Sequence, residues 1–303
     1  MKLARYLCKR NAHRNRECYG FLLAEKAVCL QSLAKVSNIG FPPLLKDFIA
    51  LGSSVLEKAE HLLEKASERD IEDASLLADQ VRLLAPIPLP PKIICLGLNY
   101  RDHISETRGA IPDEPIIFMK PHTAIIGPNE KIVKPSFVRK LDYEAELAVV
   151  IGKRAKNVSV SEAGSCIFGY TILNDVSARD IQFKDKQWTR GKGFDTFAPT
   201  GPYIVTASQL QDVSDLSIRT WVNGELRQNS TTRNMVFNVY ELVHHLSRVM
   251  TLEPCDIIAT GTPSGVGFAM KPRPKFLHPG DSVRIEIEKI GVLENKVVEP
   301  RQD

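Results

Sequence analysis

The most informative segment of the chain reads Asp142-Tyr143-Glu144-Ala145-Glu146-Leu147-Ala148-Val149-Val150-Ile151. Its apolar half is typical of a β-strand, and residues two apart on a strand point to the same face. The carboxylates of Glu144 and Glu146 are therefore expected to converge on one spot, where two like charges need a cation between them. The alternative is a solvated strand face with alternating charges, which is the usual meaning of Glu-x-Glu alone.

A third carboxylate follows at the end of another apolar run, in Asn174-Asp175-Val176. Three carboxylate groups suit hard cations rather than metals that prefer thiolate or imidazole ligands. The sequence therefore predicts a site for Mg²⁺, or for Mn²⁺ or Ca²⁺, made by Glu144, Glu146 and Asp175.

The composition is that of an ordinary globular protein. The chain has 303 residues, of which 43% are apolar and 25% are charged, enough for a large domain and a small one. A net charge of +4, spread along the chain without interleaved aromatic residues, argues against nucleic acid as a partner. No apolar run approaches the roughly 20 residues that span a bilayer, so no membrane partner is expected.

The six cysteines are scattered and form no Cys-x-x-Cys pair, which argues against a zinc site and a disulfide framework. They favour free thiols in a reducing compartment. We expect a cytoplasmic protein, with the mitochondrial matrix as the alternative because the residues before Glu17 are basic and lack acids, as in a transit peptide. The alternation within residues 1–7 instead favours a strand.

Four prolines within Pro86–Pro91 form an extended connector that cannot continue a helix, and we place a domain boundary there. Before it, Tyr19–Ala24 and Ala27–Leu30 are predicted to form a hairpin, and residues 44–67 have a helical period that Gly52 interrupts. The expected small N-terminal α+β domain covers residues 1–85, and a second domain covers residues 86–303.

The second domain is rich in β signals, so the fold class is mixed α/β and β-rich. Asn223-Gly224 indicates a hairpin turn, and Val239–Met250 is the one clear helix. The predicted strands are Ile93–Leu98, Ile116–Lys120, Leu147–Ile151, Ile167–Leu173, Tyr203–Thr206, Ile218–Val222, Asp256–Ala259 and Val283–Ile287.

A polar segment, Asn99–Glu106, follows the first of these strands. If it forms a helical turn, His103 and Glu106 are neighbours on one face. A carboxylate beside an imidazole orients it for general-base catalysis on water. A plain surface His–Glu pair is the alternative.

Two positively charged side chains, Arg179 and Lys192, follow Asp175 in the sequence and are candidates for binding a substrate. Arg179 and Gln182 follow it at intervals of four and three residues, and an arginine near a metal site can hold a substrate carboxylate. Arg179 can equally pair with Asp175 or Asp180. Lys192, between two glycines, can reach a developing oxyanion or be an ordinary surface lysine.

The glycine-rich segment Thr260–Gly267 resembles a phosphate loop only superficially, because no Lys-Ser or Lys-Thr pair follows it. We therefore reject nucleotide binding. A tight turn that presents the Thr262 hydroxyl and backbone N–H groups to a carboxylate fits better, with a plain connecting loop as the alternative.

The order of these motifs resembles that of the fumarylacetoacetate hydrolase family over about residues 92–298. The motifs are, in sequence order, Tyr-x-x-His-x-x-Glu, Glu-x-Glu, Asp-x-x-x-Arg-x-x-Gln, Lys192 and Gly-Thr-Pro-x-Gly-Val-Gly. Residues 115–118 and 193–197 are similar to one branch of the family. The resemblance implies a β-rich roll of mixed sheets, commonly a homodimer, with residues 86–303 as the catalytic domain. It further implies roles for nine residues: Glu144, Glu146 and Asp175 as metal ligands, His103 and Glu106 as a catalytic dyad, Lys192 as the group that polarises the substrate, and Arg179, Gln182 and Thr262 as the lining of its pocket.

The implied chemistry is that of an enolate, on a 2-oxo acid or a 1,3-dicarbonyl acid, with the metal as a Lewis acid. We expect C–C bond hydrolysis or decarboxylation, with keto–enol tautomerisation of oxaloacetate or a related isomerisation as the alternative. The rival from another class is a metabolite-binding protein without catalysis, which would need the metal and Arg179 but no base.

Overall fold

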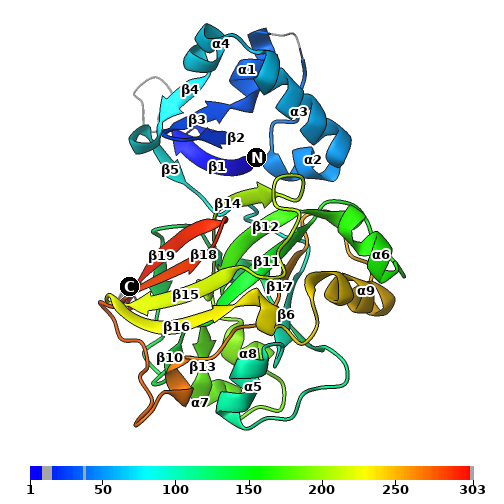
Figure 1. Ribbon diagram of the computed structural model, residues 1–303. Helices are drawn as coiled ribbons and strands as arrows, with labels where there is room; N and C mark the ends of the chain where they lie inside the picture. The colour runs from blue at the N-terminus through cyan, green and yellow to red at the C-terminus, as the bar shows by residue number, and fades with distance from the viewer. Residues whose placement is uncertain (9–15, 37–38, 301–303) are drawn as a thin grey trace.

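The computed structural model describes residues 1–8, 16–36 and 39–300. The described residues up to 85 form the upper part of the molecule in Figure 1, and those from 86 onward form the larger lower part. The upper elements are β1 (Lys2–Cys8), β2 (Glu17–Leu23), β3 (Lys26–Cys29), α1 (Leu30–Val36), α2 (Leu45–Ala50), α3 (Ser53–Lys65), α4 (Glu68–Asp73), β4 (Ser75–Leu77) and β5 (Val81–Leu83), with a 3₁₀ turn at Ala78–Gln80.

Most expectations for this part are confirmed. β1 is a strand, β2 and β3 form an antiparallel hairpin, and α2 and α3 are separated at Gly52, which has a φ of +78°. The short helices α1 and α4 were not expected. Lys9, Arg10 and Arg14, which contribute to the basic N-terminal pattern, lie outside the described residues.

The lower part is built mainly of strands. Its strands are β6 (Ile93–Gly97), β7 (Ile116–Lys120), β8 (Ile125–Ile126), β9 (Lys131–Val133), β10 (Leu141–Asp142), β11 (Ala145–Ile151), β12 (Ile167–Asn174), β13 (Ser177–Ala178), β14 (Ala198–Thr206), β15 (Ser217–Val222), β16 (Glu225–Thr231), β17 (Ile257–Ala259), β18 (Ser282–Ile287) and β19 (Gly291–Val298). Its helices are α5 (Arg101–Thr107), α6 (Val160–Ala163), α7 (Arg179–Gln182), α8 (Thr189–Lys192) and α9 (Val239–Val249), with 3₁₀ turns at His122–Ala124, Gly164–Cys166, Thr232–Asn234 and Gly267–Ala269.

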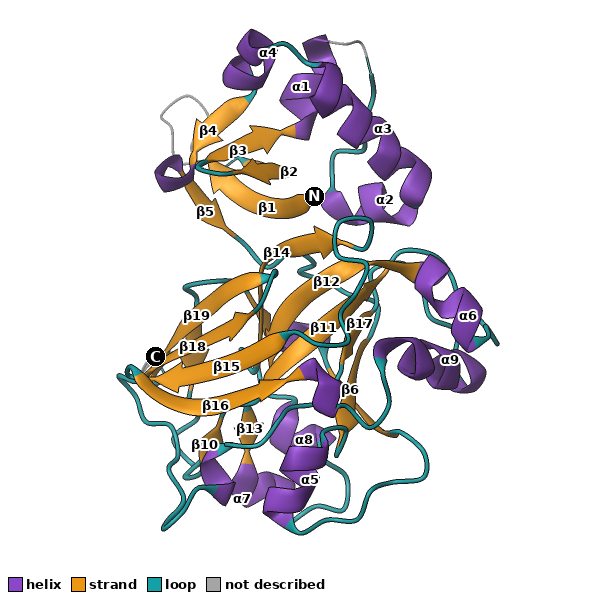
Figure 2. Ribbon diagram, viewed as in Figure 1, coloured by secondary structure: helices purple, strands orange, loops and turns teal. Residues whose placement is uncertain are grey.

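One large sheet runs through both parts of the described chain, in the order β4-β3-β2-β1-β14-β12-β11-β17-β6-β7. β1 pairs antiparallel with β14 and joins the N-terminal strands to the rest. A second sheet has the order β16-β15-β18-β19-β9 and packs beside β11 and β12 (Figure 2). The division of the chain at residues 85 and 86 stays a prediction.

Strand β11 is buried along its whole length, which explains why its sequence is apolar apart from Glu146. Leu147, Val149 and Ile151 belong to the core shared with the second sheet, whereas Ala148 and Val150 belong to the core shared with the N-terminal helices. The strand is therefore fixed from both sides, and the residues at its N-terminal end are held in place.

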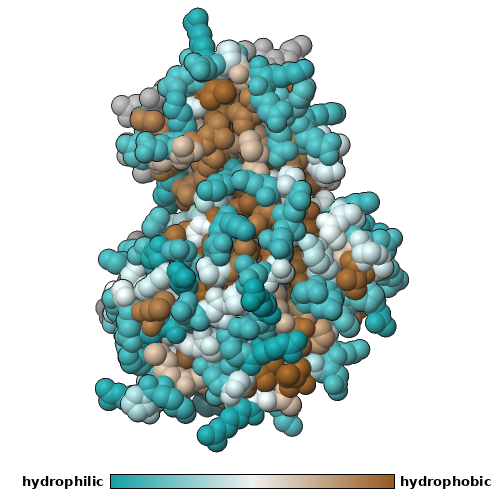
Figure 3. Space-filling model, viewed as in Figure 1, coloured by the Kyte–Doolittle hydropathy of each residue, from teal (hydrophilic) through white to brown (hydrophobic). Residues whose placement is uncertain are grey.

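The expected helix at Val239–Met250 is present as α9, but the short helices α6, α7 and α8 were not expected. Asn223 and Gly224 form the two-residue turn between β15 and β16, with φ values of +51° and +82°. Across the described residues, every helix is too short or too polar to cross a lipid bilayer. Hydrophilic side chains cover most of the face drawn in Figure 3, with apolar surface between them in the upper part and in smaller areas of the lower part.

Candidate active site

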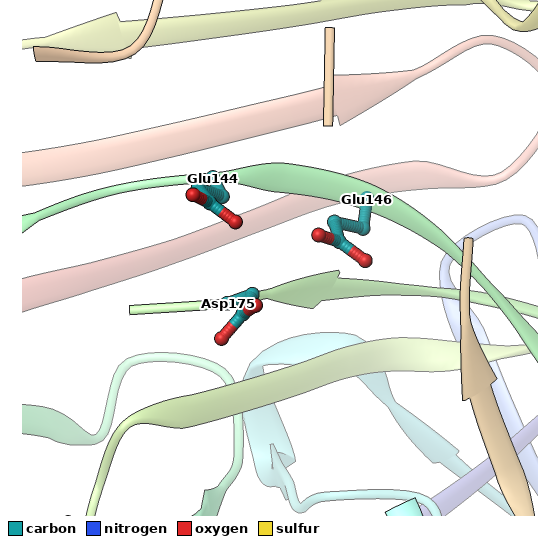
Figure 4. A group of neighbouring side chains, drawn as sticks. All are labelled: Glu144, Glu146 and Asp175. Carbon is teal, nitrogen blue, oxygen red and sulfur yellow. The ribbon is translucent and has the colours of Figure 1, made fainter. Parts of the chain in front are cut away.

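Three buried carboxylates meet where β11 begins and β12 ends. Because these strands are antiparallel neighbours, with Ala145 opposite Asn174, Glu144 and Glu146 lie beside Asp175. One carboxylate oxygen from each residue lies within 4.8 Å of the other two. Figure 4 shows the three side chains close together on neighbouring parts of the chain. Glu144 is 6% exposed, Glu146 1% and Asp175 0%, so the interpretation of Glu-x-Glu as a solvated strand face is wrong.

Two buried lysines neutralise part of this charge. Lys192 Nζ donates to Glu144 Oε2 at 2.8 Å and to Asp175 Oδ2 at 2.5 Å. Lys120, at the end of β7, donates to Asp175 Oδ1 at 2.5 Å and to the carbonyl oxygen of Val176 at 3.2 Å. Lys192 is 2% exposed and its ammonium group lies 4.9 Å from the centre of the Phe118 ring, so it is not an ordinary surface lysine.

The charge balance leaves Glu146 as the least compensated carboxylate. Within the described part of the chain, its carboxylate accepts a hydrogen bond from the backbone N–H of Gly261, at 2.8 Å, and forms no ion pair. Burial, followed by the charges of Asp175 and Glu144, raises the pKa of Glu146 well above its usual range. Burial opposes ionisation of Glu144 as well, but Lys192 and Arg179 outweigh it and lower the pKa of Glu144 to about 2. A cluster of carboxylates that repel one another in this way fits a hard divalent cation.

Arg179 is held by two carboxylates. Its Nε donates to Asp142 Oδ2 at 2.9 Å, and its Nη2 lies 2.7 Å from Glu144 Oε1. Its Nη1 donates to the side-chain oxygen of Gln182 at 2.9 Å. The partners of Arg179 are therefore Asp142 and Glu144, and not the Asp175 or Asp180 that the sequence spacing suggested.

Helix α5 carries the expected His–Glu pair. His103 Nδ1 lies 2.7 Å from Glu106 Oε1, one turn further along the helix. The second oxygen of Glu106 accepts from the backbone N–H of Gly265 at 3.0 Å. Asp102, in the first turn of α5, accepts from the hydroxyl of Ser230 at 2.6 Å, which ties the helix to β16. His103 is 8% exposed, so the pair is not a solvated surface contact.

The loop Thr260–Gly267 presents backbone N–H groups to carboxylates, as expected, and these carboxylates belong to the protein itself. Its N–H groups at Gly261, Gly265 and Gly267 donate to Glu146, Glu106 and Asp142, respectively. The Thr262 hydroxyl oxygen accepts from the amide of Gln228 at 2.8 Å, and Thr262 still lines the cavity described next.

A cavity of about 230 Å³ opens in front of these groups. Six of the predicted site residues line it: His103, Glu144, Arg179, Gln182, Lys192 and Thr262. Its other walls are mostly apolar and include Leu98, Phe118, Trp188 and Phe268. The Phe268 ring lies 4.5 Å from the Arg179 guanidinium and 6.3 Å from the His103 ring, edge-on to the latter.

The structure thus brings all the predicted site residues together, although their roles stay predictions. Sequence reasoning missed Lys120, Asp142 and Phe268. Asp142 is 0% exposed and accepts from four groups: the N–H of Tyr143, Gly267 and Phe268, and Nε of Arg179. The signal available in the sequence for Lys120 was its position directly after the apolar residues of a predicted strand.

Comparison with known proteins agrees with this geometry. The profile described as Fumarylacetoacetate (FAA) hydrolase C-terminal matches residues 92–298. The chain is 45% identical, over 288 residues and 92% of each chain, to a fumarylacetoacetate hydrolase domain-containing protein 2 homolog of Dictyostelium discoideum. It is 46% identical over 259 residues to a mitochondrial oxaloacetate tautomerase of Xenopus laevis, covering 85% of this chain and 79% of that one.

A solved structure extends the comparison to a metal. Maleylpyruvate hydrolase from Sphingobium sp. SYK-6, in complex with manganese(II) and pyruvate, matches with a TM-score of 0.79 and 30% identity. The match covers 99% of this chain and 100% of that chain. The expected mixed, β-rich fold is confirmed, and a protein of the same fold binds a divalent metal.

Proposed function

Because the chain belongs to the fumarylacetoacetate hydrolase family, we propose that it is a divalent-metal-dependent enzyme that acts through an enolate on 2-oxo or 1,3-dicarbonyl acids. The observation that carries this proposal is the cluster of Glu144, Glu146 and Asp175 beside the His103–Glu106 pair. Glu144, Glu146 and Asp175 would hold Mg²⁺, or Mn²⁺ or Ca²⁺. Bound there, the cation would supply Lewis-acid stabilisation of the enolate.

The His103–Glu106 dyad would move the proton. The contact between Nδ1 and Glu106 places the proton of a neutral imidazole on Nδ1, which leaves Nε2 as the basic atom. His103 lines the cavity, so Nε2 would take a proton from the carbon next to the substrate carbonyl and return it in the reverse reaction. The N–H of Gly265 donates a hydrogen bond to the second oxygen of Glu106, which would keep the carboxylate oriented toward the imidazole.

Charged and polar groups on the other side of the cavity would bind the acid. Lys192, held against Glu144 and Asp175, would offset negative charge that develops on the enolate oxygen. Arg179, Gln182 and Thr262 would orient the substrate carboxylate. Because Asp142 and Glu144 already hold the Arg179 guanidinium, its position is set before the substrate arrives.

Keto–enol tautomerisation of oxaloacetate is the reaction we favour within this class. It is supported by the name of the Xenopus laevis relative and by the size of the cavity. A volume of about 230 Å³ lies below the roughly 300–1,000 Å³ of pockets for drug-sized ligands, and it suits a four-carbon acid. Hydrolysis of a C–C bond is the second candidate, supported by the resemblance to a maleylpyruvate hydrolase, with His103 activating water.

The experiment that tests metal dependence compares protein stripped with EDTA with the same protein after addition of Mg²⁺ or Mn²⁺. The substrates are oxaloacetate and a series of acylpyruvates. Activity that disappears on stripping and returns with the metal supports the proposal. Full activity of the stripped protein on these substrates contradicts it, and metal binding without turnover of any of them indicates the rival metabolite-binding protein.

We further propose that the protein is a homodimer, to be tested by light scattering. The cytoplasm stays the expected compartment. The mitochondrial matrix is the alternative, and the name of the Xenopus laevis relative favours it. Immunofluorescence with a matrix marker distinguishes the two.

A further inference from the structure

Phe268 contacts two of the proposed site residues, although it lies just beyond the last motif of the sequence. The guanidinium carbon of Arg179 lies over its ring, 4.5 Å from the ring centre. The rings of Phe268 and His103 are nearly perpendicular, with their centres 6.3 Å apart. Phe268 is half-buried and lines the cavity of about 230 Å³. The proposed function leaves this side chain without a role.

Hydrogen bonds and an ion pair hold the edge of the Arg179 guanidinium. Nε donates to Asp142 at 2.9 Å, Nη1 donates to Gln182 at 2.9 Å, and Nη2 lies 2.7 Å from Glu144. These contacts use three of the five N–H donors of the guanidinium, which all lie in its plane. An aromatic ring attracts the same cation through its π electrons and uses no donor. Phe268 therefore adds to the hold on Arg179 without taking a donor that a substrate carboxylate would need.

One carboxylate oxygen places Phe268 beside Arg179. Asp142 Oδ2 accepts from Nε of Arg179 at 2.9 Å and from the backbone N–H of Phe268 at 3.0 Å. The chain can approach Asp142 this closely because residue 267 is glycine, where a Cβ would lie 2.5 Å from Asp142 Oδ1. Asp142 is 0% exposed, so the guanidinium and the turn that carries the ring are fixed to the same buried group.

The Phe268 ring also packs against the end of α7. The backbone N–H of Phe183 donates to the carbonyl oxygen of Arg179, so these two residues are one helical turn apart and their side chains share a face. The rings of Phe183 and Phe268 meet edge to face, with their centres 5.2 Å apart. Phe183 is 59% exposed and lines the same cavity, so this aromatic pair lies where the cavity meets solvent. The pair therefore limits the access of water to Arg179.

Burial strengthens the contact between Arg179 and the ring. A cation–π contact is weak in water and gains strength when the pair is shielded from solvent. Arg179 is 2% exposed, so its contact with Phe268 is of the shielded kind. Without the ring, the carboxylates of Asp142 and Glu144 would be the main attraction on the guanidinium, and they would draw it toward themselves.

We propose that Phe268 is a positioning residue: its ring holds the Arg179 guanidinium in the orientation that binds the carboxylate of the substrate. This inference rests on the proposed function, because it requires Arg179 to bind an oxo acid. The contact with Arg179 is closer than the contact with His103. Phe268 therefore acts on the binding of the acid and not on the transfer of the proton.

The test compares substitutions of the ring in the full-length protein loaded with Mn²⁺. The probe is pyruvate, a simple 2-oxo acid, and isothermal titration calorimetry gives its dissociation constant. Phe268→Leu keeps an apolar side chain but removes the ring, and pyruvate should bind about tenfold more weakly. Phe268→Tyr keeps the ring and should bind pyruvate within about twofold of the wild type. A trifluorinated phenylalanine at position 268 keeps the shape but withdraws electrons from the ring, and its affinity should lie between these two.

Kinetics and a matched control separate this role from a structural one. With oxaloacetate as the substrate, Phe268→Leu should raise KM about tenfold and change kcat by less than about threefold. Phe137→Leu makes the same exchange at a residue that is 65% exposed and is not part of the cavity wall, and it should leave KM and pyruvate binding unchanged.

The possible failures differ in their meaning. Pyruvate binding in Phe268→Leu that equals that of the wild type contradicts the role of Phe268, as does a fall in kcat with unchanged pyruvate affinity. Wild-type affinity in the trifluorinated protein also contradicts it, because the side chain would then act through its bulk alone. If the metal-loaded wild type binds neither pyruvate nor oxaloacetate, the proposed function itself is wrong, and this inference fails with it.

Discussion

His103 Nδ1 and Glu106 Oε1 lie 2.7 Å apart on α5, and Glu106 is in turn fixed by a backbone N–H of the loop that also contacts Glu146. The same loop therefore holds one member of the dyad and one member of the carboxylate cluster. This connection sets the spacing between the groups that would move a proton and the groups that would hold a metal.

His103→Ala should remove catalysis and leave the metal site intact. The imidazole is the proposed base, so we expect turnover to fall by about 10²–10⁴-fold. Metal affinity, measured by isothermal titration calorimetry, should stay near that of the wild type, because His103 is outside the carboxylate cluster. A fully active His103→Ala protein would show that the dyad assignment is wrong.

Glu146→Gln should weaken the metal site without destabilising the metal-free protein. Loss of one ligand should lower metal affinity by more than about 100-fold. Because Glu146 is buried beside two other carboxylates, removing its charge relieves repulsion, and the melting temperature of the metal-free variant should equal or exceed that of the wild type. Glu57→Gln, at an exposed position on α3, is the control and should change neither quantity. Unchanged metal affinity in Glu146→Gln would exclude this residue as a ligand.

Metal binding should release protons over the pH range in which Glu146 is still protonated in the metal-free protein. The pKa of Glu146 is raised in the folded, metal-free protein, whereas a free glutamate ionises near about 4.3. The proton must leave before the carboxylate binds a cation, so affinity should rise with pH until Glu146 is ionised. Calorimetry in buffers of different ionisation enthalpy measures the released protons, and heats that are equal in all buffers would contradict this prediction.

The same pKa shift predicts how the stability of the metal-free protein depends on pH. A carboxyl group whose pKa is raised by folding stabilises the folded state below its unfolded pKa. This contribution is lost as the pH rises through the folded pKa. Thermal melts of EDTA-treated protein should therefore show a falling melting temperature over that range, and Glu146→Gln should reduce the fall. An equal fall in the variant would show that another group is responsible.

Asp142→Asn should destabilise the site around Arg179. Asp142 accepts from four donors, and an asparagine amide would turn an NH₂ group toward some of them. Breaking a buried ion pair on one side costs about 3–5 kcal/mol, so urea unfolding should show a loss of this size, together with a raised KM. Asp180→Asn, next to Arg179 in sequence, is the control and should cost about 1 kcal/mol or less. Equal effects of the two substitutions would argue against a special role for Asp142.

Whether a contact in the site could be predicted depended on how far apart its two residues lie in the sequence. The convergence of Glu144 and Glu146 follows from the period of a strand, and that of His103 and Glu106 follows from a helical turn, so both were visible in the sequence. Lys120 and Asp175 are 55 residues apart and Asp142 and Arg179 are 37 apart, and they meet only because of the order of the strands. A carboxylate was expected in front of the loop N–H groups, but the individual acceptors could not be identified because they come from three different elements.

The secondary structure shows the same difference between features set by local sequence and features set by distant partners. Apolar strands such as β11 and β12 were predicted from their composition alone. Strand β16, with the polar sequence Glu-Leu-Arg-Gln-Asn-Ser-Thr, was missed because its strand conformation depends on pairing with β15. Local sequence patterns therefore predicted the apolar strands, whereas a polar strand such as β16 was missed because it depends on pairing with another strand.

The most direct test of the central claim follows freshly dissolved enol-oxaloacetate with the purified protein, recording loss of the enol absorbance and formation of pyruvate separately. The account predicts fast loss of the enol with Mg²⁺ present, little pyruvate, and no acceleration after EDTA treatment or in His103→Ala. Pyruvate formed at the rate of enol loss would instead indicate a decarboxylase that uses the same groups. Enol loss that is equally fast without metal and without His103 would contradict the account.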